Sequence, residues 1–328
     1  MMSGTMQATA GTTGLSAAMG AFVSSSMNRS GVTLADMQAL MNQLATSGGQ
    51  LPGAGTGATP PGMMSGTAFM GAMHSGTVTA YAVSGGAMGV PLDSATLDPA
   101  GDFTLALGAY SGTVMLEVTG GSFMDPATGT TMTMGTGDIL RSCVASFDPA
   151  ATTTGVRITP LTSMAQAMAQ GMVGGMTAAN VGTANADVGS YFMVDDILGT
   201  MPMDPTVAGS TGAATVASRN YGMTIAAMSQ YAHTVGMTGP SSAMVTAMAD
   251  DASDGVMNGM MGSTPITMTG MGGGMMGGGG MMSTTAGTTG LATAMSTFAG
   301  SSMNRSGVTA TDMQNLVDKL AASTGTIQ

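Results

Sequence analysis

The feature that most constrains this chain is a segment that occurs twice, once near each end. Residues 9–47 recur as residues 285–323, at a constant offset of 276 and without a gap. About two thirds of the 39 aligned positions are identical, more than chance produces even in a chain with 53 glycines and 40 methionines. Because self-similarity at a fixed spacing marks copies of one structural unit, the two ends are predicted to be one duplicated module.

Each copy has the apolar spacing of two amphipathic helices. Leu15, Met19 and Phe22 follow one another at helical intervals, and a second periodic run begins at Leu34. The second helix also has a capping pattern, a threonine followed three residues later by an aspartate, at Thr33 and Asp36 and again at Thr309 and Asp312. Each end is therefore predicted to be a helical hairpin. Two such helices leave an apolar stripe that needs another surface to cover it.

We expect that stripe to form an interface. Its residues are Leu15, Met19, Phe22, Met37, Leu40, Met41 and Leu44 in the first copy and Leu291, Met295, Phe298, Met313, Leu316 and Leu320 in the second. If the C-terminal hairpin of one subunit packs on the N-terminal hairpin of the next, the contact is heterologous and propagates into a ring or an open filament. Two alternatives stay open: the hairpins pack together within one chain, or the chain is one period of a longer tandem array.

The break between the two helices contains an Asn-x-Ser triplet in each copy. Asn28 and Asn304 are interpreted as turn residues, with N-glycosylation as the alternative. A calcium loop is rejected, because Ser26 occupies the first ligand position where such loops have aspartate.

Between the hairpins the pattern changes twice. Residues 48–74 have the glycine and proline content of a linker, and residues 75–160 alternate apolar and polar positions with turns at 98–102 and 120–121. This predicts a small antiparallel β-sandwich. Residues 161–262 have helical periodicity, beginning with Thr159 as an N-cap before Pro160.

The predicted fold class is therefore α+β and multidomain. Its parts are an N-terminal hairpin (1–47), a linker (48–74), the sandwich (75–160), an all-α region (161–262), a glycine- and methionine-rich linker (263–284) and a C-terminal hairpin (285–328).

Composition excludes several classes of protein. A net charge of −11 with only six basic residues is incompatible with electrostatic binding of nucleic acid. The single cysteine, Cys143, excludes c-type haem, a disulfide framework and a thiolate zinc site, and it is expected to be a buried thiol in a strand. No apolar run is long enough for a membrane helix. With 7% charged residues, the chain looks like an exported surface protein.

Catalysis is not predicted. The two histidines, His74 and His233, have no local nucleophile beside them. The close carboxylate groups, which are Asp195, Asp196, Asp250, Asp251 and Asp254, could supply an acid and a base, but exposed helix ends explain them equally well.

The methionines raise a second possibility. Thioethers bind cuprous ion, and tentative ligands at the required close spacing are Met271, Met275, Met276, Met281 and Met282. Adaptable core packing is favoured, because methionine is spread over every segment, and sacrificial oxidation is a further alternative.

The middle of the chain also resembles a known family. GTVTAYAV, GDFTL, GTVMLEVTGGSFMDPATG and ITPLTSMAQAMA, within residues 75–261, are similar to carboxypeptidase-regulatory-like or immunoglobulin-like modules of bacterial exported surface proteins, which a helical region often follows. The resemblance implies an extracellular or cell-envelope setting and a scaffold or adhesive role, and it implies no catalytic residues. The sequence thus predicts a structural subunit of an extracellular filament or surface layer that polymerises with itself. A methionine-rich protein of the cell envelope that binds Cu(I) or Ag(I) is the alternative.

Overall fold

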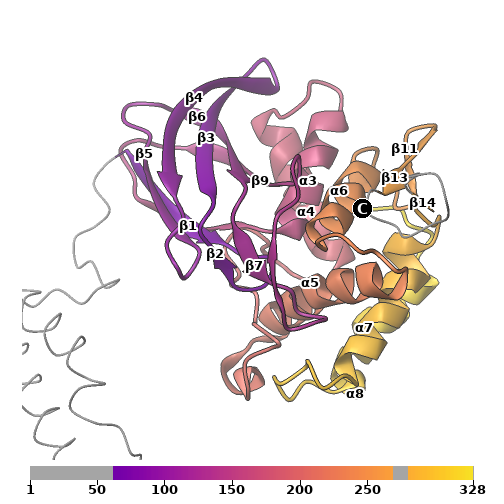
Figure 1. The fold of residues 1–328 in the computed structure, drawn as a ribbon. Helices are drawn as coiled ribbons and strands as arrows, with labels where there is room; N and C mark the ends of the chain where they lie inside the picture. Colours follow the sequence, from indigo (N-terminus) through magenta and orange to yellow (C-terminus); the bar gives the residue numbers. More distant parts are fainter. Residues whose placement is uncertain (1–61, 269–279, 328) are drawn as a thin grey trace, which may run out of the picture. The chain divides into compact units, whose positions relative to one another are not determined.

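The computed structural model describes residues 62–268 and 280–327, which begin with β-strands and continue with helices (Figure 1). These residues belong to one compact unit. The fold is α+β, as the sequence predicted. The predicted N-terminal hairpin (1–47) lies outside the described residues.

The larger sheet has the order β4-β3-β6-β9, and all three of its pairings are antiparallel. Its strands are β3 (Thr77–Ser84), β4 (Ala87–Thr96), β6 (Gly112–Thr119) and β9 (Ile139–Phe147). Strand β6 is buried on both faces. Val114, Leu116 and Val118 belong to the core between the sheets, whereas Met115 belongs to the core formed with the helices. This sheet therefore separates two hydrophobic cores.

A second sheet, of order β10-β1-β5, shares the first of these cores. It consists of β1 (Met63–Ala68), β5 (Asp102–Ala106) and β10 (Thr153–Ile158), and β1 pairs with β10 in parallel. A Cβ at Gly66 would lie 1.9 Å from the carbonyl oxygen of Val156, so only glycine lets the two strands approach here. A third, small sheet contains β2 (Met73–His74), β7 (Ser122–Met124) and β8 (Thr131–Thr133).

The first strands begin earlier than the sequence indicated. Residues 63–74, which we placed in the linker 48–74, form β1 and β2, and Met64 and Met73 are fully buried. The parallel β1–β10 pair also departs from the purely antiparallel sandwich that we expected.

The helical part consists of α3 (Pro160–Gly171), α4 (Ala178–Tyr191), α5 (Val216–Thr234), α6 (Ser242–Ala252), α7 (Leu291–Ala299) and α8 (Ala310–Ala322). Helix α3 begins as predicted: Pro160 follows the N-cap Thr159, whose side chain accepts a hydrogen bond from the Thr162 amide. Its start is fixed to β9, because Ser163 Oγ accepts from the Arg141 amide at 2.7 Å. No helix of the described residues is long and apolar enough to cross a membrane.

Helix α5 is buried along most of its length. Every residue from Asn220 to Ala232 is buried, including several polar ones. The polar groups are satisfied: Asn220 Nδ2 donates to the Met193 carbonyl at 3.0 Å, and Thr224 Oγ1 donates to the Asn220 carbonyl at 2.7 Å. A helix buried all round provides surface on more than one side for neighbours to pack against.

The C-terminal hairpin is part of the same core. Its apolar residues cluster with those of α3 to α6. The regions 161–262 and 285–328, which we predicted as separate parts, therefore share one hydrophobic core. Four short strands pair antiparallel in this region: β11 (Met260–Met261) with β12 (Thr264–Pro265), and β13 (Thr267–Met268) with β14 (Gly280–Met281). Strands β12, β13 and β14 lie in the predicted linker 263–284, whereas β11 lies at the end of the predicted all-α region 161–262.

Candidate functional site

The candidate site is the surface that holds the C-terminal hairpin. Helix α7 lies along α5 (Figure 1). Leu291, Met295 and Phe298 are buried in the same cluster as Ile225 and Met228 of α5. We call this surface the hairpin seat. It consists of α5, Ser190 and Tyr191 at the end of α4, the loop 205–211 and the segment 255–257.

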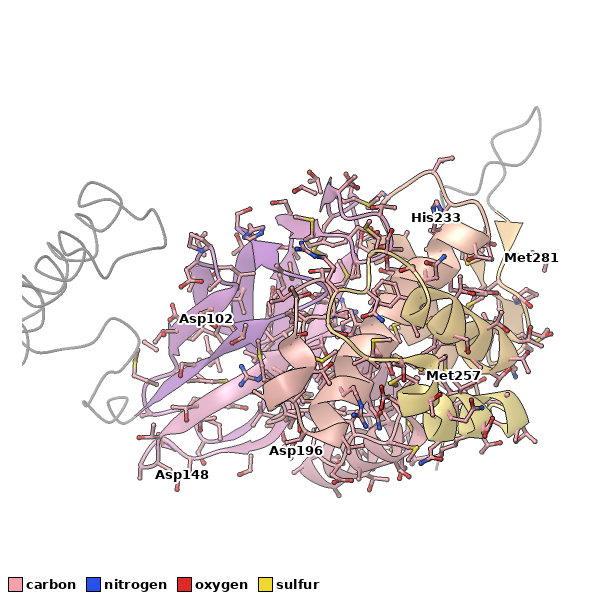
Figure 2. The ribbon with its side chains drawn as sticks, turned by 90° about the horizontal axis from the view of Figure 1, so that it is seen from below. Asp102, Asp148, Asp196, His233, Met257 and Met281 are labelled. Atoms are coloured by element: carbon pink, nitrogen blue, oxygen red, sulfur yellow. The ribbon has the colours of Figure 1, made fainter. Side chains whose placement is uncertain are left out.

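Close contacts fix the entry of the chain into α7, which is the π-helical turn η2 (Ala286–Gly290). Tyr191 donates its hydroxyl hydrogen to the Gly287 carbonyl at 3.1 Å. A Cβ at Gly287 would lie 2.5 Å from the Met257 side chain, and one at Gly290 would lie 2.9 Å from the Tyr231 ring. Figure 2 shows Met257 beside the C-terminal helices. The seat therefore requires glycine at two positions of this turn.

The turn between α7 and α8 is held by the loop 205–211. The amides of Arg305 and Ser306 donate to the Pro205 carbonyl at 2.8 and 3.1 Å, and the Gly209 amide donates back to the Arg305 carbonyl at 3.1 Å. Because these are backbone contacts, they depend on the path of the turn and little on its side chains.

Asn304 has the turn role that the sequence suggested. Its Nδ2 donates to the carbonyls of Ala299 and Val308 at 2.8 and 2.7 Å, and its Oδ1 accepts from Ser306 Oγ at 2.6 Å. Helix α8 then begins with the predicted capping box of Thr309 and Asp312. A glycan on Asn304 would replace one of these N–H donors.

The residues after α8 also pair with the seat. The Met257 amide donates to the Gly325 carbonyl at 2.8 Å, and the Ile327 amide donates to the Gly255 carbonyl at 2.9 Å. Gly325 has a φ of +92°, and a Cβ there would lie 2.5 Å from the Met257 carbonyl oxygen. Ile327 is buried. The contact between the C-terminal segment and the seat thus continues past the end of the duplicated 39 residues.

Asp251 supports the segment that carries Met257. Its Oδ1 accepts hydrogen bonds from the amides of Asn258, Gly259 and Met260, at 2.9, 2.6 and 3.1 Å. Its Oδ2 is buried and has no hydrogen-bond partner among the described residues. Burial raises the pKa of this carboxyl group to about 6, although the three amides act in the opposite direction.

The interface residues predicted in the C-terminal copy are all part of this arrangement. Leu291, Met295, Phe298, Met313, Leu316 and Leu320 are buried within their own chain. The stripe that we expected to be offered to a neighbouring hairpin is therefore already covered. The other predicted interface residues, Leu15, Met19, Phe22, Met37, Leu40, Met41 and Leu44, lie outside the described residues.

The tentative soft-metal ligands are described only in part. Met271, Met275 and Met276 lie outside the described residues. Met281 is 64% exposed, whereas its neighbour Met282 is 5% exposed and packed in the core. Within residues 62–268 and 280–327, no group of three or more histidine, cysteine or acidic residues could hold a metal ion. The Cu(I) and Ag(I) hypothesis stays a prediction.

Two of the groups considered for catalysis have backbone partners. His74 Nδ1 lies 2.7 Å from the Pro99 carbonyl oxygen, and Asp196 Oδ1 accepts from the amides of Leu198 and Gly199. Asp196 and His233 lie well apart (Figure 2). Cys143 is a buried free thiol in β9, as expected, and desolvation raises its pKa to about 12.

Sequence reasoning missed the seat itself. The one glycine of α5, Gly222, does not indicate the seat, because it leaves room for the backbone at Met203 and not for the hairpin. A Cβ at Gly222 would lie 1.8 Å from the Met203 carbonyl oxygen.

Comparisons of the chain with protein-family models, curated proteins and solved structures give no match. The function of the protein is therefore inferred from the geometry of the seat and from the duplicated sequence.

Proposed function

We propose that this protein is a structural subunit without catalytic activity that associates with copies of itself. The observation that carries the proposal is where the two terminal copies differ. Thirteen residues of 285–323 are buried, and twelve of them are identical in 9–47. Of the other twenty-six positions, only fourteen are identical. The exception among the buried residues is Ala292, which corresponds to Ser16.

This distribution supports a role in which protein also covers the N-terminal copy. Exposed positions diverge freely, whereas buried positions keep their volume because a change leaves a cavity or causes a clash. A hairpin of two helices cannot cover its own apolar stripe. Residues 9–47 therefore have the properties of a segment that packs against a further surface, which another copy of the chain can provide.

The contact differs from the four-helix cluster that the sequence suggested. In such a cluster the stripes of two hairpins face each other, but the stripe of α7 and α8 is covered by the chain's own helices. We therefore place the N-terminal hairpin against a seat, and not against a C-terminal hairpin.

We also propose an extracellular setting, in a filament or a surface layer. Support comes from the low charge content, from the single buried cysteine and from the two sheets that share one core, which we interpret as an immunoglobulin-like module. Few charges suit a subunit that buries much of its surface in an assembly.

The test is sedimentation velocity and negative-stain electron microscopy of the full chain over a range of concentrations. Leu40→Asp places a charge at the position aligned with buried Leu316, and Ala39→Asp is the matched control, aligned with exposed Asn315. We expect concentration-dependent oligomers for the parent chain and the control, and their loss in Leu40→Asp. A parent chain that stays monomeric at every concentration would contradict the proposal.

A further inference from the structure

We infer that the hairpin seat of one chain accepts residues 9–51 of a second copy, in the place where residues 285–327 lie in the structure. The inference rests on the proposed function and names the surface that such an assembly uses. It implies an exchange, because a seat holds one hairpin at a time and each chain carries two hairpin sequences.

The glycines give an argument independent of the apolar residues. Residues 285–327 contain five glycines, of which four are required by a close contact or a positive φ and one is not. The four required glycines, Gly287, Gly290, Gly307 and Gly325, all have glycine counterparts, at residues 11, 14, 31 and 49. The fifth is Gly300, where an added Cβ would lie no closer than 3.7 Å to its nearest neighbour, and its counterpart is Ser24.

Three of these requirements come from the seat and not only from the hairpin. Gly287 and Gly325 are constrained by Met257, and Gly290 is constrained by the Tyr231 ring as well as by Thr285. Gly287 is constrained by the seat alone, whereas Gly290 also lies close to the Thr285 carbonyl oxygen of the hairpin itself and Gly325 has a φ of +92°. A hairpin that packed on some other surface would therefore have no reason to keep the glycine aligned with Gly287. The N-terminal copy therefore has the glycines that it needs to pack on a surface with Met257 and Tyr231 in the same positions as in this seat.

The match continues past the end of the duplicated segment. At the same offset, Gly49 corresponds to Gly325, and Leu51 corresponds to the buried Ile327. Leucine and isoleucine have the same volume, so the site that holds Ile327 can hold Leu51 with little repacking. Besides the glycine already counted, one further feature of the tail that contacts residues 255–257, the apolar residue at 327, is thus kept.

The polar contacts of the hairpin can also be made by the N-terminal copy. The backbone hydrogen bonds to the loop 205–211 need only the same turn, and the residues that shape it are retained as Asn28, Ser30, Thr33 and Asp36. Lys319 Nζ donates to the Ser190 carbonyl. The equivalent Gln43 also has an N–H donor for this carbonyl.

Exchange between chains explains why both hairpins are kept. Replacing 285–327 by 9–51 within one chain leaves a single molecule, whereas replacing it by 9–51 of another chain links the two. The chain's own hairpin has the advantage of being tethered beside the seat, so exchange is favoured by high local concentration or by a weakened C-terminal hairpin.

The experiment uses two full-length chains, each with one new cysteine. The acceptor carries Ser190→Cys and the donor carries Gln43→Cys, at the pair of positions that Lys319 and Ser190 define. Cys143 is buried and does not compete for a maleimide. The chains are mixed, incubated and treated with a short bismaleimide, and the products are separated under denaturing conditions. The positive control is one chain with Ser190→Cys and Lys319→Cys, which cross-links internally.

The expected result is a covalent dimer of acceptor and donor. Its yield rises several-fold when the acceptor also carries Leu316→Ala, which weakens the resident hairpin. Adding Leu40→Asp to the donor abolishes the dimer, and adding Ala39→Asp does not.

Two results would overturn the inference. One is the absence of dimer when the positive control cross-links. The other is an internal cross-link in a chain that carries both Ser190→Cys and Gln43→Cys, without dimer in the mixture. Sedimentation of the same samples separates the two proposals: oligomers without this cross-link leave self-association standing and remove the exchange, whereas monomers remove both.

Discussion

The C-terminal copy carries Asp318 and Lys319 where the N-terminal copy carries Asn42 and Gln43, yet both have leucine at the next position, 320 and 44. The structure explains the difference, because Asp318 and Lys319 are exposed and Leu320 is buried. Exposed positions differ between the copies in charge and size, whereas twelve of the thirteen buried positions are identical. We propose that both copies fit a surface of the same shape, and the described residues contain one such surface, the hairpin seat.

The largest expected difference between the copies is in folding stability. Phe298 is fully buried against the seat, so Phe298→Ala should lower the free energy of unfolding by about 3–5 kcal/mol. The aligned change Phe22→Ala should leave the unfolding of residues 62–327 in a dilute sample unchanged and weaken self-association. Denaturant unfolding and sedimentation measure the two effects. Equal destabilisation by both changes would contradict the distinction between resident and donor hairpins.

The next largest expected effect is a pH dependence of folding stability that comes from Asp251, which supports the seat. The pKa of Asp251 is raised from 3.8 to about 6 in the folded state, so the folded state binds the proton more tightly than the unfolded state. This contribution to stability is fully present below about pH 4 and is lost as the pH rises through about 6. Its size is at most about 3 kcal/mol, from about 1.4 kcal/mol per pKa unit.

Asp251→Asn isolates this contribution. The amide keeps an oxygen for the three backbone donors but does not titrate. We expect the unfolding free energy of the parent chain to fall between pH 4 and pH 7 relative to that of the variant. Parallel pH profiles of the two proteins would show that Asp251 does not titrate in this range.

A smaller effect distinguishes required from tolerant glycines. Gly325→Ala introduces a Cβ against the Met257 carbonyl at a φ of +92° and should cost about 1–3 kcal/mol of unfolding free energy. Gly300→Ser, which installs the residue of the N-terminal copy, should change it by less than about 0.5 kcal/mol. Thermal or denaturant unfolding compares them. A larger cost for Gly300→Ser than for Gly325→Ala would remove the argument from the glycines.

The smallest expected effect is at the single buried position where the copies differ. Ala292 is 3% exposed, so Ser16 would place a hydroxyl group in a nearly dry position when residues 9–51 occupy a seat. Ser16→Ala should tighten self-association by up to about tenfold, which corresponds to about 1.4 kcal/mol. Ser24→Ala, aligned with exposed Gly300, is the control and should change little. Sedimentation equilibrium provides both association constants.

Local signals in the sequence predicted several elements correctly. The start of α3 at Thr159 and Pro160, the capping box of α8 and the buried Cys143 depend on neighbouring residues or on a residue's own chemistry. These features can be predicted because short-range hydrogen bonds and φ restrictions determine them. The α+β class was predictable for the same reason, since the periodicity changes from two to about 3.6 near residue 160.

Features that depend on distant partners were not predictable. The segment 63–68 has the composition of a linker and is a strand only because β5 and β10 pair with it. The stripe of the C-terminal hairpin indicated that something covers it, but not what. Helix α5 gave little sign of its burial, because Asn220, Thr224 and Gln230 are polar and lie inside only through specific hydrogen bonds.

The isotopic origin of one cross-link shows whether residues 9–51 of one chain occupy the hairpin seat of another. A full-length chain with both Ser190→Cys and Gln43→Cys is prepared unlabelled and uniformly labelled with nitrogen-15. The two preparations are mixed, incubated, cross-linked and digested, and the peptide pair joining residues 43 and 190 is weighed by mass spectrometry. If residues 9–51 occupy the seat of another molecule, we expect pairs with one labelled and one unlabelled peptide. Pairs whose two peptides always share the same label would contradict this inference.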